Sequence, residues 1–105
     1  MTYTLPEHIK TKIRQIIGHY TQVERATLFG SHAKGTATER SDIDIAIQGQ
    51  RLDRFVIADI ALSFDDSDIP LQIDLQNYSE IKNTALKEHI DRIGIHQMIN
   101  RNLRR

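Results

Sequence analysis

The chain has 105 residues, with 14 basic and 14 acidic side chains and a formal net charge of zero. This length predicts one domain, residues 1–105, and 39% apolar with 27% charged residues predicts a packed core. The balanced charge excludes a whole-molecule attraction for nucleic acid or anionic membranes, and the absence of cysteine excludes disulfides and thiolate metal sites. No apolar run approaches the roughly 20 residues of a membrane span. We therefore expect a cytoplasmic protein without membrane binding or strong direct nucleic-acid binding.

The first elements along the chain are a helix and a short buried strand. Thr4 and Glu7 have the spacing of a capping box, Pro6 suits a first turn, and isoleucines follow at helical intervals. These features predict a helix from about Leu5 to His19. The short apolar run from Ala26 to Phe29 then favours a buried strand.

Two further strands carry acidic residues on their polar faces. From Ile43 to Ile47 the isoleucines share one parity, while Asp42 and Asp44 share the other. The segment from Leu71 to Gln76 alternates in the same way and places Asp74 on its polar face. We expect the isoleucines to face a core and the aspartates to face away from it.

The remaining pattern predicts two more helices. One runs from about Leu52 to Leu62, where apolar residues recur at intervals of three and four, and the other begins near Asn77 and Glu80 and ends near Gly94. The alternation of helices and strands predicts an α/β domain with one small sheet. Three apolar residues near the C-terminus fit a partner-contact surface and a core element equally well, namely Ile95, Met98 and Ile99.

The three aspartates have the spacing of a metal site. Asp42 and Asp44 leave one strand on the same side, and their Cα atoms are about 6.5 to 7 Å apart at a rise of roughly 3.3 Å per residue. A carboxylate from the neighbouring strand, Asp74, would complete a site for two hard cations such as Mg²⁺. Each of these features alone is more typical of a solvated strand edge.

The turn between the first two strands strengthens the functional interpretation. Gly30 permits a tight bend and Ser31 offers a hydroxyl group, so the segment from His32 to Gly35 can present N–H groups to a phosphate. A phosphate-binding turn combined with paired carboxylates indicates nucleotide chemistry. The same segment lacks both the Walker lysine spacing and the dinucleotide fingerprint.

These residues resemble a known family. The string from Leu28 to Gly35, followed by Ser41 to Asp44, resembles the Gly-Ser, ten residues, Asp-x-Asp signature of the polymerase-beta-like nucleotidyltransferase superfamily. It is most similar to the minimal nucleotidyltransferases, the MNT proteins. The resemblance implies the nucleotidyltransferase fold, an α/β fold in which a small mixed β-sheet is flanked by helices.

The resemblance also implies roles for individual residues. Gly30 and Ser31 match the residues that bind the triphosphate of ATP, and Lys34 stands where the family usually has arginine, which keeps the charge but loses the bidentate fork. His32 replaces a more commonly apolar or aromatic residue, and we interpret it as a rim histidine without catalytic duty. Three carboxylates are implied to bind Mg²⁺ or Mn²⁺ and to act in catalysis, namely Asp42, Asp44 and Asp74.

The implied reaction is attack by an acceptor hydroxyl on the α-phosphorus of a nucleoside triphosphate, with pyrophosphate leaving. MNT proteins are commonly antitoxins paired with a small helical HEPN toxin, and some transfer AMP to a tyrosine of that partner. The predicted elements leave no room for a second, acceptor-binding domain, so we expect a HEPN-type partner in a hetero-oligomer. Two alternatives stay open: a slow or non-catalytic nucleotide-binding module that neutralises its partner by masking, and an enzyme that modifies a small molecule.

Overall fold

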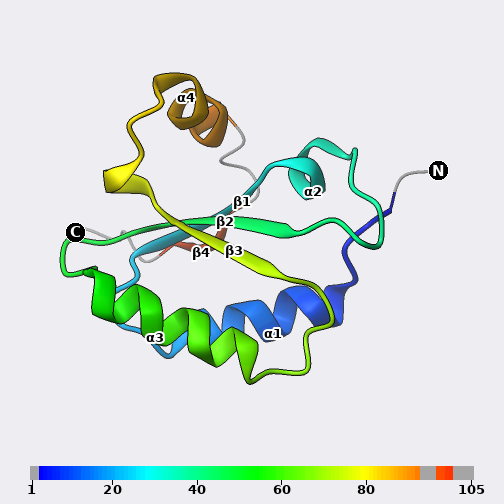
Figure 1. Ribbon diagram of the computed structural model, residues 1–105, viewed down its shortest axis with the longest axis horizontal. Coiled ribbons are helices and arrows are strands. Elements are labelled where there is room, and N and C mark those ends of the chain that lie inside the picture. Colours follow the sequence, from blue (N-terminus) through cyan, green and yellow to red (C-terminus); the bar gives the residue numbers. More distant parts are fainter. Residues whose placement is uncertain (1–2, 93–96, 101–105) are drawn as a thin grey trace.

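The computed structural model describes residues 3–92 and 97–100, which form one mixed β-sheet with helices on both of its faces (Figure 1). The elements in chain order are α1 (Glu7–Gly18), β1 (Arg25–Phe29), α2 (Ser31–Lys34), β2 (Ile43–Gln48), α3 (Arg54–Asp65), β3 (Ile73–Asn77), the 3₁₀ helix η1 (Tyr78–Glu80), α4 (Thr84–Arg92) and β4 (Gln97–Asn100). This arrangement confirms the predicted fold class. None of the helices described is long and apolar enough to cross a membrane.

The sheet has four strands in the order β3-β2-β1-β4. The β2 and β3 strands are parallel, and α3 forms the crossover between them, whereas β1 is antiparallel to both β2 and β4. The two strands that carry the predicted acidic residues are therefore neighbours at one side of the sheet.

The main core lies between the sheet and the two long helices, α1 and α3, on one face (Figure 1). The alternation in β2 places its three isoleucines on this face, where each is fully buried. The apolar sides of α1 and α3 pack against these isoleucines and complete the same buried cluster. The buried residues that close the core against β2 include Ile13, Ile17, Ile60 and Phe64.

The opposite face of the sheet is divided into an apolar half and an acidic half. Phe29, Ala46 and Ile90 form a smaller buried cluster beneath α4, with Tyr78 packed against it. Asp44 has the same strand parity as Ala46, so it also lies on this face. The carboxylates are thus held beside the small cluster rather than over the main core.

Several predicted element ends are wrong. The Thr4–Glu7 capping box does not form, because Pro6 is the N-cap of α1 and makes no side-chain cap hydrogen bond. Asn77 caps η1 instead of the last helix, and that helix begins one turn later, where Asn83 Oδ1 accepts from the Leu86 N–H at 3.2 Å. Each difference has a local cause, since a short polar side chain can cap either a 3₁₀ turn or an α-helix.

The sequence did not determine where the C-terminal apolar residues and one residue of α3 lie, and the structure now locates two of them. Ile99 lies in β4, pairs with Ala26 and packs against the main core, so the core interpretation is confirmed for this residue. The predicted helix end at Gly94 and the side chains of Ile95 and Met98 lie outside the described part of the chain. Phe55, one of the apolar residues that follow the helical period of α3, is 71% exposed.

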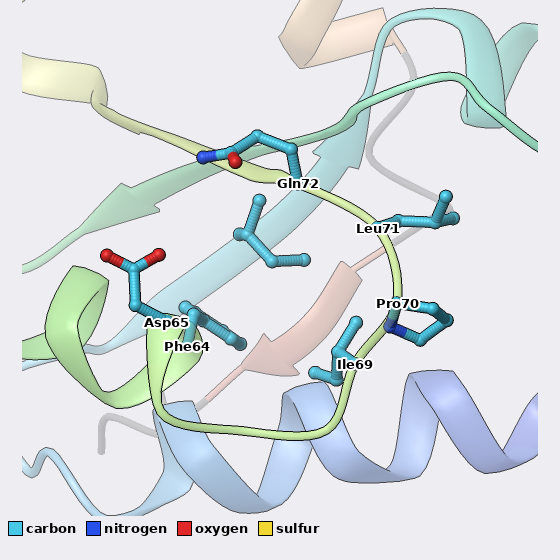
Figure 2. Close-up of a pocket in the computed structure, with 7 residues that line it drawn as sticks. Phe64, Asp65, Ile69, Pro70, Leu71 and Gln72 are labelled. Carbon is cyan, nitrogen blue, oxygen red and sulfur yellow. The ribbon is translucent and has the colours of Figure 1, made fainter.

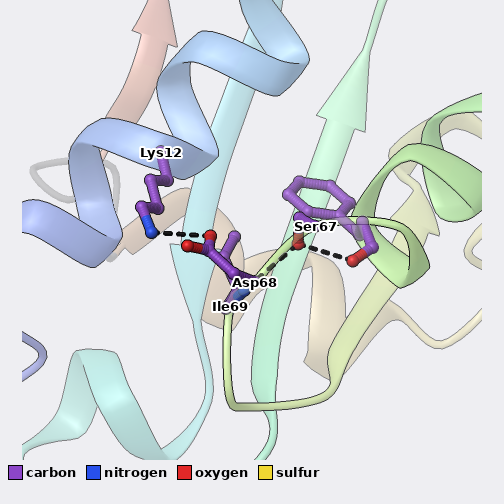
Figure 3. A network of polar contacts seen from close by, with 5 residues as sticks. Lys12, Ser67, Asp68 and Ile69 are labelled. Atoms are coloured by element: carbon purple, nitrogen blue, oxygen red, sulfur yellow. Dashed lines mark hydrogen bonds and ion pairs between the residues drawn. The ribbon is translucent and has the colours of Figure 1, made fainter.

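The loop from α3 to β3 is fastened to its surroundings by polar contacts (Figure 3). Lys12 Nζ on α1 donates to Asp68 Oδ1 at 2.6 Å, and this contact lowers the pKa of the Asp68 carboxyl. Ser67 Oγ donates to the Phe64 carbonyl at 2.6 Å and accepts from the Ile69 N–H at 3.3 Å. These bonds fix the point at which the chain turns into β3.

Candidate active site

The two inner carboxylates of the predicted site are direct neighbours across the sheet. Asp44 on β2 is the register partner of Asp74 on β3, and the parallel pairing continues through Ile45 and Leu75. Strands lie about 4.8 Å apart and paired residues point to the same face, so the two carboxylates stand side by side. Asp42 precedes β2 by one residue and is exposed. The structure therefore brings Asp44 and Asp74 together, whereas Asp42 lies exposed at the entry to β2 beside this pair.

This arrangement raises the pKa of the Asp44 carboxyl. Its pKa is raised above the ordinary value, first by burial, then by the negative charges of Asp74 and Asp42, and further by a hydrogen bond with Asp74. The positive charge of His32 acts in the opposite direction. Carboxylates that repel one another in this way favour a cation or a proton between them.

Gly30 brings the backbone of the β1–α2 turn against the same carboxylate. It has φ 76° and ψ −151°, a left-handed conformation that side chains rarely adopt. A Cβ atom at this position would overlap Asp44 Oδ2, so any side chain here would displace the carboxylate. Glycine is required both for the turn and for this close approach, as the sequence predicts.

The amide groups of the turn are arranged differently from the prediction. The N–H groups of Ala33 and Lys34 donate to the Gly30 carbonyl at 3.1 and 2.9 Å, and the Gly35 N–H donates to Ser31. These three amides are therefore unavailable to a phosphate. The amides of Ser31 and His32 lie at the beginning of α2, and none of the residues described accepts a hydrogen bond from them.

His32 links the turn to the strand that carries the aspartates. Its Nε2 donates to the Ser41 carbonyl at 2.9 Å, directly before Asp42, and its ring makes an edge contact with Tyr3 at a centroid distance of 5.9 Å. Sequence reasoning assigned His32 to the rim without further duty. The structure gives it a positioning contact, which no local pattern in the sequence indicates.

His89 on α4 is a second residue that the sequence did not point to. The Gly30 N–H donates to His89 Nε2 at 3.4 Å, and the His89 ring lies edge-on to Phe29 at 6.4 Å. Burial, followed by the positive charges of Lys34 and Arg92, lowers the pKa of His89. Lys34 is exposed at the end of α2, so its charge lies near the turn as predicted. The 59-residue separation between Gly30 and His89 explains why the contact is invisible in the sequence.

The chemistry of the carboxylates fits a hard divalent cation. The side chains supply only oxygen donors, their mutual repulsion raises the pKa of Asp44, and the glycine turn leaves the space that a Cβ would fill. In the described part of the chain, no group of three acidic or histidine side chains is already clustered as a complete metal site. The inner pair Asp44 and Asp74 is formed, and Asp42 lies exposed beside it.

A surface pocket lies away from these carboxylates. It has a volume of about 230 Å³ and is bordered by Phe64, Asp65 and the segment Ile69–Ile73 (Figure 2). Ile73 has the strand parity opposite to that of Asp74, so the pocket belongs to the face that carries α1 and α3. It is a surface hollow at the α3–β3 loop and has no part in the acidic site.

Comparison with known proteins agrees with this geometry. The family model of the polymerase beta nucleotidyltransferases matches residues 11–100, which include every predicted site residue. The chain belongs to this family. It is similar to the probable protein adenylyltransferase MntA of Haemophilus influenzae, with 33% identity over 72 residues. That match spans 68% of this chain but only 60% of the relative, less than two thirds of its length.

Two solved structures have the same fold. A toxin–antitoxin complex with AMP-PNP contains a chain that is 26% identical, with a TM-score of 0.68, covering 91% of this chain and 74% of that chain. A mutant of the MntA–HpeT toxin–antitoxin pair gives a TM-score of 0.69 at 22% identity, covering 87% and 72%. The second likeness concerns the fold alone.

Proposed function

We propose that this protein is a metal-dependent nucleotidyltransferase that moves a nucleoside monophosphate, AMP from ATP, onto a hydroxyl of a partner protein. The observation that carries the proposal is the juxtaposition of three features: the register pair Asp44 and Asp74, the neighbouring Asp42, and the Gly30 turn against Asp44. Family membership supports the class of reaction. Catalysis of this type depends mainly on positioning and charge neutralisation, which these residues suffice to provide.

The triphosphate is assigned to the turn at the start of α2. The free amides of Ser31 and His32, the Ser31 hydroxyl and the Lys34 ammonium group are the donors available there. Asp42, Asp44 and Asp74 would hold Mg²⁺ or Mn²⁺, which when bound would offset the negative charge of the polyphosphate. The Gly30 turn sets the distance between the phosphate donors and the carboxylates.

The transfer step is a substitution at the α-phosphorus. The acceptor oxygen forms a bond to the α-phosphorus, the bond to the bridging oxygen of the β-phosphate breaks, and pyrophosphate leaves. The acceptor proton passes to the Asp74 carboxylate, which is exposed and therefore accessible to an incoming hydroxyl. Asp44, being more buried, serves better as a fixed ligand than as a proton acceptor.

We further propose that the acceptor belongs to a HEPN-type toxin and that the protein acts as its antitoxin in the cytoplasm. The support is the similarity to MntA of Haemophilus influenzae, named a probable protein adenylyltransferase, and to the chain from the toxin–antitoxin complex with AMP-PNP. Asp42 and Asp74 are both exposed, so a second protein can deliver its hydroxyl to Asp74. The expected product is a hetero-oligomer in which the partner carries AMP.

The decisive experiment mixes the protein with the product of the neighbouring reading frame, ATP and Mg²⁺, and measures intact masses. The wild type should add one or more AMP groups to the partner, whereas Asp74→Asn should bind the partner without transferring AMP. Asp66→Asn, at an exposed aspartate outside the site, is the matched control and should transfer normally.

The masking module is the competing function, and one observation favours it. The three carboxylates are not clustered as a complete metal site among the residues described. A stable complex with no mass change, in which wild type and Asp74→Asn neutralise the partner equally, would establish masking and refute the transferase.

A further inference from the structure

The outward side of α3 carries an apolar ridge that nothing in the described chain covers. Phe55 is 71% exposed and Leu62 is 60% exposed, although large apolar residues on this helix otherwise pack inward, as Ile60 and Phe64 do. The two exposed residues are seven positions apart, close to two helical turns, so they lie in line along the helix. Ala58, also exposed, lies between them.

The C-terminal end of α3 carries charges that oppose its helix dipole. Asp65 is the last residue of the helix and Asp66 is the C-cap, with no basic residue in the last turn. The start of the helix is mixed, because the Asp53 carboxylate caps it and accepts from the Phe55 and Val56 N–H groups, while Arg54 is the first helical residue. Negative charge is unfavourable at the end of a helix, so the acidic end of α3 gains from a cation beside it. The Arg54 side chain of a second copy can supply that cation.

We propose that the α3 ridge is the interface of a homodimer in which two copies of α3 pack antiparallel about a two-fold axis. The midpoint between Phe55 and Leu62 falls between residues 58 and 59, so an axis there places Phe55 of each copy against Leu62 of the other. The same axis places Arg54 opposite Ser63 of the second copy, about half a helical turn from Asp65, a distance that the long arginine side chain spans. Such an interface is isologous and closes after two subunits.

The side chains suit a close antiparallel approach. Ala58 is small and lies near the axis, which allows the interaxial distance of about 8 to 10 Å that packed helices adopt. The Arg54 guanidinium already lies over the Phe55 ring at 5.2 Å, so charge and apolar surface are presented together. The Asp59 carboxylates of the two copies repel each other near the axis. With only one helix from each copy, the interface is small, and the dimer is weak and concentration-dependent.

The dimer leaves the nucleotide site open. Helix α3 lies on the face of the sheet opposite to α2 and α4 (Figure 1). Asp44 and Asp74 have the strand parity opposite to that of the residues packed against α3, so they lie on the α2 and α4 side. The inference is therefore independent of the proposed reaction. Asp44→Asn should dimerise like the wild type even though it is inactive.

Sedimentation velocity over a range of protein concentrations provides the first test. The wild type should shift from monomer to dimer as the concentration rises, and Leu62→Asp should remain monomeric with an unchanged circular dichroism spectrum. A wild type that stays monomeric at the highest soluble concentration would overturn the proposal.

Cysteine cross-linking locates the interface, because the natural chain has no cysteine. Ala58→Cys places a thiol beside the axis and should form a disulfide-linked dimer under mild oxidation. Ala85→Cys, at an exposed position on α4, is the matched control and should not. Equal cross-linking of the two variants, or none with Ala58→Cys in a dimeric sample, would assign the contact to another surface.

A charge exchange tests the antiparallel orientation. Arg54→Asp alone should weaken dimerisation at least several-fold, because it places like charges opposite each other. The double variant Arg54→Asp, Asp65→Arg restores opposite charges across the interface and should regain the wild-type dissociation constant or a tighter one. Failure of the double variant to recover would contradict the proposed pairing.

Discussion

Asp44 and Asp74 are register partners on parallel strands, and the Gly30 turn fills the space directly against Asp44. This relationship places two carboxylates side by side, with the negative charge of Asp42 acting on the same group. The consequence is a site whose charge repulsion is built into the strand register. Stability and cation binding at this site are therefore linked.

The first prediction concerns Asp44 and pH. Burial and the charges of Asp74 and Asp42 raise its pKa above the ordinary 3.8, so the folded state retains the proton to a higher pH than the unfolded chain. Folding stability therefore falls as the pH rises from the unfolded pKa through the raised folded pKa, and the loss is complete above it. We expect Asp44→Asn to melt at a higher temperature than the wild type at neutral pH.

The same measurement at acid pH provides the control. Below the unfolded pKa the carboxyl is protonated in both states, so the advantage of Asp44→Asn should shrink. Glu39→Gln, an exposed acidic residue in a loop, should show no such pH-dependent gain. Thermal melts that keep the same difference at both pH values would refute the electrostatic explanation.

The second prediction concerns cation binding. A divalent ion that binds only the folded state stabilises it by about 2.7 kcal/mol at a concentration one hundred times its Kd. We expect Mg²⁺ or Mn²⁺ to raise the melting temperature of the wild type and a chelator to reverse the effect. The triple variant Asp42→Asn, Asp44→Asn, Asp74→Asn should lose this response. An equal cation-induced shift in the triple variant would place the ions elsewhere.

The third prediction concerns Gly30. Gly30→Ala strains the positive φ and forces its Cβ into Asp44, so we expect lower stability, by about 1 to 3 kcal/mol for the backbone strain, and at least a tenfold loss of nucleotide binding. Gly35→Ala is the matched control, because Gly35 also has a positive φ of 80°. It should lose stability but retain most of the binding measured by titration calorimetry. Equal losses of binding would attribute the effect to strain alone.

The strands and the inner site were predictable because both depend on local alternation. The isoleucine parity of β2 fixes which side faces the core, and it therefore also places Asp44 on the other side. The parallel pairing with β3 is not encoded locally, yet the alternating apolar positions make one register favourable, since a one-residue slip would expose Ile73 and Leu75. The tight turn at Gly30 could also be predicted, because glycine readily adopts the positive φ that this turn requires.

The remaining features depend on contacts between distant segments. His89 reaches Gly30 only after α4 folds over the sheet, and β4 pairs with β1 across most of the chain. Phe55 fits the helical period but lies on the outward side, because the direction of packing is set by the sheet and not by the helix itself.

The fourth prediction separates the two sides of α3. Ile60 is fully buried in the main core, so Ile60→Ala should lower the free energy of unfolding by about 2 to 5 kcal/mol. Leu62 is 60% exposed, so Leu62→Ala should change it by less than about 0.5 kcal/mol in dilute solution. Denaturant titration of both variants measures the difference. Comparable losses would show that Leu62 packs inward.

The fifth prediction concerns the hydrogen bond from the Gly30 N–H to His89 Nε2 at 3.4 Å. This bond requires an unprotonated Nε2, and burial with the charges of Lys34 and Arg92 lowers the pKa of His89, which keeps the ring neutral to a lower pH than an ordinary histidine. His89→Phe keeps the ring against Phe29 but removes the acceptor, so we expect ATP binding with Mg²⁺ to weaken by about 1 kcal/mol, roughly fivefold.

His89→Gln is the variant that distinguishes the hydrogen bond from packing. Its side-chain oxygen can replace Nε2 as the acceptor, so it should bind ATP more tightly than His89→Phe although it lacks the ring. Protonation of residue 89 can weaken ATP binding only in the wild type, because neither glutamine nor phenylalanine titrates. Wild-type affinity for ATP should therefore fall as the pH drops below the lowered pKa of His89. The affinity of His89→Gln should change less over the same range. Calorimetric titrations of the three proteins across this pH range measure both effects. If His89→Phe binds as well as the wild type and His89→Gln does not, then the aromatic contact with Phe29, and not the acceptor, holds the turn in place.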